Sequence, residues 1–322
     1  MIFRIQRLGH YCVGVVLALL LIGSGRARRA RREALSQEKI SAISFHRPNR
    51  RLFRRCIAWL IKNGYTFIAA DDVVEFLHRG KPIPKGAVWL SFDDGWKELA
   101  EILPLVQKHH IPITLFLPSG VLEGDGRFPW LRDPTHPSFS REEALRRSAP
   151  HSLDSRDAIT VEELLKIAAY PEVTIGAHSV SHPVMPNCSD ETMRFEVVDC
   201  KRALESWTGK TVDCFAYPEG KYDGRERRFL IESGYQLAVT TRSEFITRDA
   251  DCYLVPRFVA GDHVSFPQAI CSMVGIWRTV ADPLKAVRNA VTQVRRGGGT
   301  FAPARAGRHS QRPPGGGTVP GV

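Results

Sequence analysis

Short, nearly continuous apolar runs alternate along the chain with segments in which apolar residues recur at helical spacing. Strands of a parallel sheet that is covered on both faces read as continuous apolar runs, because neither face meets water. The alternation over residues 38–278 therefore predicts an α/β fold, either a (β/α) barrel or an open doubly wound sheet. The candidate strands are residues 40–45, 66–70, 87–92, 113–117, 173–177, 212–217, 237–241 and 254–259.

Residues 190–207 show the clearest helical pattern. Ser189 is the predicted N-cap and Gly209 the predicted stop. One stripe of the segment is apolar, which predicts a helix that packs on the sheet. The stripe contains Met193, Val197, Cys200, Leu204 and Trp207.

Residues 1–34 differ from the rest of the chain. Residues 11–22 are apolar and follow Arg4 and Arg7, which resembles the central region of a signal peptide and is short for a membrane span. Five arginines follow within residues 26–32, and positive charge on that flank opposes translocation. We expect an exported or membrane-anchored protein of the cell envelope, associated with the membrane through this segment. A cytoplasmic protein, or a misassigned start, is the alternative.

Residues 35–278 are expected to form the folded domain. Within it, residues 123–157 lack clean periodicity and are rich in Pro, Ser and Arg, which predicts an insertion over one end of the fold. Residues 279–322 form a basic tail, in which residues 297–322 contain 12 Gly or Pro. Such composition is typical of disorder.

The net charge of +11 by itself would suggest binding to nucleic acid, but the charge is concentrated at the two ends of the chain. Residues 1–34 and residues 279–322 each carry +6, which leaves −1 for residues 35–278. The folded part therefore has no electrostatic basis for binding nucleic acid. The seven cysteines include no C-x-x-C pair, so neither a zinc knuckle nor a disulfide framework is indicated.

Two pairs of adjacent aspartates follow predicted strands. Asp71 and Asp72 lead directly into a helical segment with Glu75 and then Gly80, which predicts an N-cap, a first-turn acid and a helix stop. Asp93 and Asp94 instead follow a buried strand and precede Gly95 and Trp96. That sequence also makes turns, so by itself it leaves function and structure equally open.

A histidine pair follows another apolar strand. His178 and His182 lie four residues apart just beyond residues 173–177. Carboxyl ends of parallel strands gather at one edge of a sheet, so these imidazoles and an aspartate of the second pair are expected to meet. Two imidazoles and one carboxylate form a plausible three-ligand metal site with one position left for water.

Three motifs then carry a resemblance to a known family. In order, "SFDDG", "HSVSH" and "FAYPEG" resemble the successive motifs of the polysaccharide deacetylases, which share the NodB-homology domain. Flanking segments such as "HHIPITLFLPSG" agree, and the resemblance spans about residues 40–260. It implies a distorted (β/α) barrel, α/β in class, with about seven parallel strands. It also implies removal of N- or O-acetyl groups from carbohydrate with a divalent metal.

The resemblance implies a role for each motif residue. Asp94, His178 and His182 would hold the metal, for which Zn²⁺ is the first candidate, and Asp93 would be the general base. The main chain of Glu219 would donate to the oxyanion. Tyr217 and Pro218 would line the substrate groove.

The sequence departs from the family pattern at two positions. Many members have an arginine where this chain has Ala216, and Arg257 is the candidate to supply that charge beside the general base. The late Leu-x-His of the family, which protonates the leaving amine, is not recognisable. His263 and His46 are the substitutes to test. Trp130, in the insertion, is a candidate for stacking on sugar rings, with partial burial as the alternative.

The leading hypothesis is a metal-dependent hydrolase that removes acetyl groups from an N- or O-acetylated poly- or oligosaccharide of amino sugars. A deacylase of a small non-sugar amide uses the same chemistry, because the metal is indifferent to what carries the acyl group. The unrecognised acid also leaves open a catalytically impaired carbohydrate-binding relative. The polymer, its linkage and the oligomeric state stay undetermined.

Overall fold

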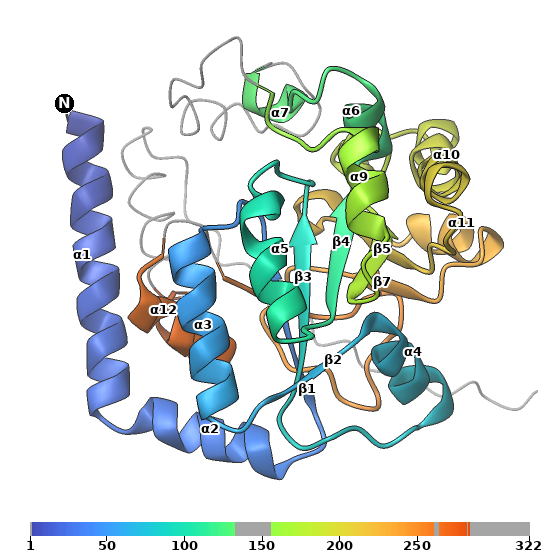
Figure 1. Ribbon diagram of the computed structural model, residues 1–322. Coiled ribbons are helices and arrows are strands. Elements are labelled where there is room, and N and C mark those ends of the chain that lie inside the picture. The colour runs from blue at the N-terminus through green and yellow to red at the C-terminus, as the bar shows by residue number, and fades with distance from the viewer. Residues whose placement is uncertain (1, 133–155, 261–263, 282, 284–322) are drawn as a thin grey trace, which may run out of the picture. The chain divides into compact units, whose positions relative to one another are not determined.

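Figure 1 shows a computed structural model of the protein, which describes residues 2–132, 156–260, 264–281 and 283. The chain divides into two units, Met1–Val280 and Ala281–Val322. All elements described below belong to the first unit. Most of the expected insertion at residues 123–157, most of the expected tail at residues 279–322, and His263 lie outside the described residues.

The described strands form one parallel sheet, in which seven strands follow the order β7-β6-β5-β4-β3-β1-β8. β2 lies off this path and pairs with the first half of β3. Because β1 occupies one edge of β3 along its length, β2 uses the other edge, which β4 takes over from Leu90 onward. The strands are β1 (Ile40–Phe45), β2 (Thr66–Ile68), β3 (Ala87–Asp93), β4 (Ile113–Leu117), β5 (Val173–Ala177), β6 (Cys214–Ala216), β7 (Leu237–Val239) and β8 (Phe258–Val259).

The sheet curls so that its two ends approach each other. The backbone N–H of Val255 donates to Ala238 O at 2.9 Å, and Thr240 N–H donates to Val255 O at 2.8 Å. These bonds join β7 to the segment that leads into β8, which pairs with β1. The predicted distorted (β/α) barrel of about seven parallel strands is therefore confirmed. Four strands are shorter than predicted, namely β2, β6, β7 and β8. In the last of these, Val255 makes an isolated bridge to Val239 and is not part of the strand.

Alternate residues of the strands enter two separate apolar clusters. In β3, Val88 and Leu90 pack toward the surrounding helices, whereas Ala87 and Trp89 join the second cluster. The second cluster also contains Ile40 of β1 and Leu237 of β7. These two strands are far apart along the sheet and meet only because it is curled. The second cluster is therefore the interior of the barrel.

Helices surround the sheet (Figure 1). They follow individual strands, as expected for parallel connections. Two short 3₁₀ turns, η1 (Met185–Asn187) and η2 (Pro218–Gly220), follow β5 and β6. The helices of this layer are α3 (Arg50–Lys62), α4 (Ala70–Arg79), α5 (Leu99–Lys108), α6 (Ser119–Glu123), α7 (Pro129–Arg132), α9 (Val161–Ala168), α10 (Asp190–Thr208), α11 (Glu226–Glu232) and α12 (Phe266–Met273).

Two helices test the predicted capping patterns. α10 begins after Ser189, whose Oγ accepts from Thr192 N–H at 3.1 Å, and ends at Gly209 with φ 65°. That prediction is confirmed. The predicted N-cap at Asp71 or Asp72 is wrong by position, because α4 already begins at Ala70. Asp72 still completes the helix start, since its Oδ2 accepts from Ala69 N–H at 3.0 Å. The pair is therefore structural, as expected.

The N-terminal segment forms two further helices, α1 (Ile2–Gly23) and α2 (Arg26–Ser36). Among the described residues, no single helix has both the length and the apolar content to cross a membrane. The pair Tyr11–Gly23 and Arg26–Ser36, bent by 66°, meets the criterion by length and composition alone. The expected signal or anchor role of residues 1–34 stays a prediction.

Candidate active site

A cavity of about 180 Å³ opens at the carboxyl edge of the sheet. Side chains that end or follow most strands line it, as expected for parallel α/β folds. They include His46 after β1, Asp93 at the end of β3, His178 after β5, Tyr217 after β6, Thr241 after β7 and Val259 at the end of β8.

The two aspartates at the end of β3 leave the strand differently. Asp93 is the last residue of the strand, whereas Asp94 has φ 71° and Gly95 has φ 73°. Two successive left-handed residues turn the chain sharply, so the two side chains do not share one direction. Both carboxylates are nonetheless buried, at 3% and 5% exposure.

Asp94 faces the two histidines. Its Oδ1 lies 3.5 Å from Nε2 of His178 and 3.6 Å from Nε2 of His182. One ligand atom from each of these three residues lies within 4.8 Å of the others, and all three side chains are buried. The structure therefore brings together the three predicted metal ligands.

The three side chains form a candidate cation site. Nδ1 of His178 donates to Ala216 O at 2.8 Å, so neutral His178 presents a lone pair on Nε2. That lone pair faces Asp94 Oδ1, which is buried and has no hydrogen-bond partner within the described part of the chain. Two acceptors directed at each other are unfavourable unless a positive charge lies between them. A divalent metal with nitrogen and oxygen ligands fits this arrangement.

The charges of the site agree with this interpretation. Burial lowers the pKa of His178, but the Asp94 and Asp93 carboxylates reverse this and raise its pKa overall. Burial raises the pKa of Asp94, but the surrounding imidazoles lower it strongly overall. The site therefore attracts positive charge, and a proton on His178 would compete with a metal ion for the same position.

The loop that carries the histidines has a strained backbone. Ser179 has φ 64° and His182 has φ 59°, and His182 N–H donates to Ser179 Oγ at 3.0 Å. Glu219, across the cavity, has φ 58°. Non-glycine residues rarely adopt these angles, and such strain concentrates at functional sites. Of the described non-glycine residues with positive φ, only His110 lies away from the site loops.

Asp93 has a different partner from Asp94. Arg257, which immediately precedes β8, donates to Asp93 Oδ1 at 2.8 Å and to Oδ2 at 2.7 Å. The guanidinium also donates to Ser91 Oγ at 2.9 Å and to Thr240 O at 3.2 Å, and the side chain is 1% exposed. Burial raises the pKa of Asp93, but Arg257 lowers it below its usual range overall. Arg257 therefore lies where the sequence suggested a replacement for the arginine missing at Ala216.

The other predicted site residues vary in position. Glu219, Tyr217 and His46 line the cavity, and Tyr217 OH donates to Tyr253 O at 2.9 Å. Pro218 is buried and is not among the residues that line the cavity. His263 lies outside the described residues. The roles of these residues in substrate binding and catalysis stay predictions.

From the sequence, Trp130 is either a residue that stacks on sugar rings or a partly buried residue, and its position has features of both. It lines the cavity, yet it is only 2% exposed. Its ring stacks on that of His182, with centroids 4.1 Å apart and planes inclined by 23°, and on Phe128 at 4.6 Å. Trp130 therefore fixes the orientation of one predicted metal ligand while offering little free surface to a sugar ring.

Several residues of the site were not singled out from the sequence. Trp96 donates from Nε1 to Asp94 Oδ2 at 3.2 Å. Gly220 lines the cavity, and a Cβ there would lie 2.8 Å from Thr241 N, so only glycine fits. Thr241 and Val259 each lie at the end of a predicted strand. That position is the feature of the sequence that could have identified them as cavity residues.

Comparisons with known proteins show which family and fold this chain resembles. Residues 80–238 match the family model described as polysaccharide deacetylase. The chain is 20% identical to YxkH of Bacillus subtilis over 224 residues, which cover 69% of each chain. It is 22% identical to the poly-beta-1,6-N-acetyl-D-glucosamine N-deacetylase of Staphylococcus epidermidis, over 65% of this chain and 66% of the relative. Its fold resembles that of IcaB from Ammonifex degensii, with TM-score 0.58, 19% identity, and coverage of 74% and 98%.

Proposed function

Because this chain belongs to the polysaccharide deacetylase family, a family of carbohydrate deacetylases, we propose that it removes acetyl groups from acetylated amino-sugar carbohydrate with the help of a divalent metal. The observation that carries the proposal is the convergence of Asp94, His178 and His182 beside the paired Asp93 and Arg257. A cavity at the strand ends contains Asp93 and the three metal-site residues.

Asp94, His178 and His182 are proposed to hold the metal, with Zn²⁺ as the first candidate because its usual ligands are imidazole and carboxylate. A divalent ion bound there would supply Lewis acidity for water and for the acyl oxygen. The orientation of His178 by Ala216 O leaves the correct nitrogen facing the site. Trp96 likewise holds one oxygen of Asp94 by a hydrogen bond, so the other faces the imidazoles.

Asp93 is the proposed general base, which takes a proton from water during attack on the acetyl carbon. The two bonds from Arg257 keep this carboxylate ionised and fix its plane. Without them, burial would favour the neutral acid, which cannot accept the proton. The arginine therefore acts through Asp93 and does not need to touch the substrate.

The remaining residues of the cavity are proposed to serve the substrate. The main chain of Glu219 is the candidate donor to the developing oxyanion. His46 is the proposed proton donor to the leaving amine, because it is the imidazole of the cavity lining that is not in the metal-ligand set. His46→Gln is expected to lower kcat by about 10²-fold while the metal content is unchanged. Unchanged kcat would remove His46 from this role.

The relatives suggest the chemical class of the substrate. The staphylococcal relative is named as an N-deacetylase of poly-beta-1,6-N-acetyl-D-glucosamine. We therefore place polymers of N-acetylglucosamine first among the substrates to test. Whether the scissile bond is an amide or an ester is a matter for the same assay, because the proposed residues serve either acyl group.

The test is acetate release by the purified full-length protein. Substrates are acetylated chitooligosaccharides, a β-1,6-linked N-acetylglucosamine polymer, an O-acetylated sugar and a small non-sugar acetamide. Acetate from the sugars that stops on chelation and returns with Zn²⁺ supports the proposal. Acetate from the non-sugar amide alone would favour the small-amide deacylase. Carbohydrate binding without acetate release from any metal-loaded sample would favour the catalytically impaired relative.

A further inference from the structure

Over residues 11–23, the part of helix α1 whose side chains are described, the helix contacts the domain along one side. Ala18 and Leu21 are buried against Cys271 of α12, and Ile276 and Trp277 pack on the same cluster. A Cβ at Gly14 would collide with the side chain of Gln268, so the two helices approach closely there. Figure 1 shows α1 along the outer side of α3 and α12. The apolar segment of the N-terminus is therefore part of the packed structure.

The opposite side of α1 is apolar and exposed. Val16 is 55% exposed and Leu20 is 62% exposed, although both are large apolar side chains. Of the nine large apolar residues that are exposed within the described part of the chain, five lie in this one helix. Residues 11–22 of α1 are apolar on all sides, and such a helical segment is usually buried or in contact with apolar surroundings. The five are Tyr11, Val13, Val16, Leu19 and Leu20.

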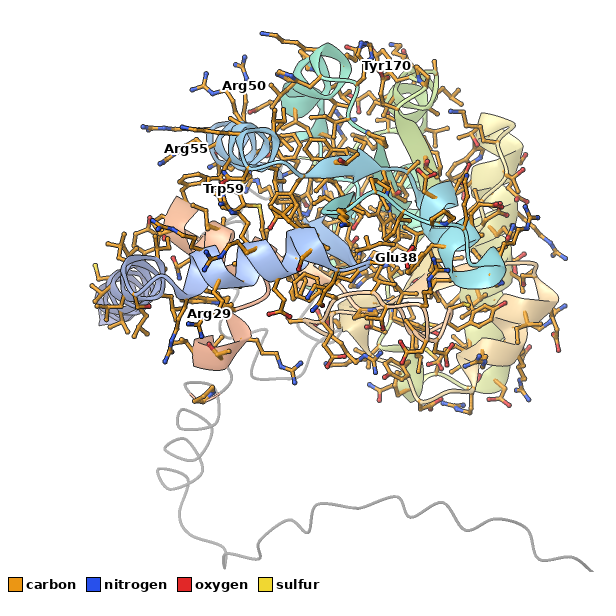
Figure 2. All side chains as sticks on the ribbon, turned by 90° about the horizontal axis from the view of Figure 1, so that it is seen from below. Arg29, Glu38, Arg50, Arg55, Trp59 and Tyr170 are labelled. Atoms are coloured by element: carbon orange, nitrogen blue, oxygen red, sulfur yellow. The ribbon has the colours of Figure 1, made fainter. Side chains whose placement is uncertain are left out.

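Two strongly basic helices lie near α1: α2, which contacts it directly, and α3, which packs on the same helix α12. α2 follows α1 directly, and its only acidic residue, Glu33, is paired with Lys39. α3 has no acidic residue and packs against α12. Figure 2 shows Arg50 and Arg55 extending from α3 into solvent, with Arg55 toward the side of the molecule where α1 lies. The exposed arginines are Arg26, Arg28, Arg29 and Arg32 of α2 and Arg50, Arg51, Arg54 and Arg55 of α3.

We propose that α1, α2 and α3 form a docking face for an anionic phospholipid surface, with α1 lying in the plane of the interface. An amphipathic arrangement of an apolar helix bordered by arginines is typical of interfacial binding. Each arginine near an anionic leaflet adds a favourable electrostatic contribution. A second copy of the chain fits less well, because a symmetric contact would bring two positive surfaces together. This inference is independent of the proposed deacetylase activity.

The experiment is vesicle flotation of the full-length protein. We expect binding to phosphatidylcholine vesicles that contain phosphatidylglycerol, weak binding to phosphatidylcholine alone, and a decrease at high salt. Val16→Glu/Leu20→Glu is expected to abolish flotation. Arg28→Glu/Arg29→Glu is expected to reduce partitioning at least about tenfold, because it reverses two charges at the surface.

Matched controls come from α10 and α11, on the other side of the molecule (Figure 1). Ile231→Glu replaces an apolar residue that is 54% exposed, and Arg194→Glu replaces an exposed arginine. Both should float like the unchanged protein. Absence of binding to anionic vesicles at low salt would overturn the proposal. So would binding that the α1 variant does not alter, or a dimer in light scattering that the α1 variant converts to a monomer.

A second inference concerns Glu196 of α10, which is 3% exposed. Its Oε2 accepts from Val180 N–H and Ser181 N–H, both at 2.8 Å, and its Oε1 accepts from Ser181 Oγ at 2.5 Å. One buried carboxylate therefore binds the middle of the loop between the two candidate metal-binding histidines. The same loop is held from the other side, because Gly120 N–H donates to Val180 O at 2.9 Å.

We infer that Glu196 is a positioning residue for the metal site, an inference that rests on the proposed function. The loop has strained backbone angles at Ser179 and His182, and such angles persist only when surrounding bonds impose them. The carboxylate of Glu196 makes charge-assisted hydrogen bonds to two backbone N–H groups and to the Ser181 hydroxyl. A glutamine at this position keeps the shape but removes the charge, and hydrogen bonds to a neutral amide are weaker. Glu196→Gln is therefore expected to loosen the histidine pair without removing a ligand.

The test measures Zn²⁺ affinity by calorimetry on the metal-free full-length protein. Glu196→Gln is expected to weaken binding about 10- to 100-fold, with kcat recovering when the metal is saturating. Glu205→Gln is the matched control, because Glu205 lies on the same helix and accepts from Val212 N–H at 3.0 Å, away from the histidine loop. Equal affinity for Glu196→Gln and the unchanged protein would overturn the inference. No Zn²⁺ binding by the unchanged protein would instead count against the proposed function.

Discussion

The two aspartate pairs of this chain start from the same sequence and end in different chemistry. Asp71 and Asp72 lie in the first turn of α4, after the short strand β2. Asp71 is exposed and Asp72 half-buried. Asp93 is the last residue of β3, a seven-residue strand that is buried throughout and lies between β1 and β4, and Asp94 follows it directly. The two aspartate pairs therefore already differ in their position relative to the sheet, before their hydrogen-bond partners are compared.

Their partners differ in distance along the chain. Asp72 accepts a hydrogen bond from Ala69, three residues away. Asp93 is held by Arg257, which is 164 residues away. A carboxylate whose partner is close in sequence stabilises the local backbone conformation. A buried carboxylate with remote partners loses its hydration, and that cost must be offset by contacts that only the complete fold provides. Burial with remote partners is thus the better indicator of chemistry.

The largest effect is expected for Asp94→Ala. This change removes the only carboxylate of the candidate metal set, and the remaining imidazoles no longer form a three-ligand site. We expect loss of bound metal, by elemental analysis, and acetate release no faster than that of the chelated protein. If the Asp94→Ala variant kept stoichiometric metal and its activity, the ion would have to bind elsewhere. The two aspartate pairs would then not differ in metal binding.

Asp93→Asn is expected to separate catalysis from metal binding. Asparagine keeps the shape but cannot accept the proton, so kcat should fall by about 10²- to 10⁴-fold. The metal content should stay that of the unchanged protein, because Arg257 and not the cation site holds this carboxylate. Activity within a few-fold of the unchanged protein would exclude Asp93 as general base.

The Asp93–Arg257 pair is also expected to contribute to stability in a coupled way. Arg257→Met leaves a buried carboxylate without its partner, which costs about 3–5 kcal/mol in the free energy of unfolding. The double variant Asp93→Asn/Arg257→Met removes both charges, so its loss should be smaller than the sum of the single losses. Urea unfolding of the four proteins measures the coupling. Additive losses would show that the two groups do not stabilise each other.

Much of the fold could be predicted because its signals are local. The strands at Ile40–Phe45, Ile113–Leu117 and Val173–Ala177 match their predicted bounds, since each is a mostly apolar run with polar residues or prolines at both ends. The capping of α10 by Ser189 follows equally local chemistry. The convergence of motif residues at the strand ends followed from parallel topology together with the family resemblance.

The rest depends on contacts that no local pattern encodes. Nothing near Trp130 indicates that its ring stacks on His182, and nothing near Glu196 indicates that it binds residues 180 and 181. The predicted N-cap of α4 is wrong because Asp72 occupies the third position of the helix. From there its carboxylate accepts a hydrogen bond from the N–H of Ala69, the actual N-cap residue. An apolar run such as residues 11–22 reads alike whether it is a leader, an anchor or a helix packed on its own domain.

The smallest effect should come from the first pair, and it should concern stability alone. Asp72→Ala removes the acceptor for Ala69 N–H and is expected to lower the free energy of unfolding by about 1 kcal/mol. Asp71→Ala should change it by less than about 0.5 kcal/mol, because this side chain is exposed and adds only a helix-end charge. Urea unfolding measures both, and acetate release by either variant should equal that of the unchanged protein. Loss of activity in Asp72→Ala at full stability would mean that this pair, too, acts in chemistry, and burial would then fail to distinguish the two.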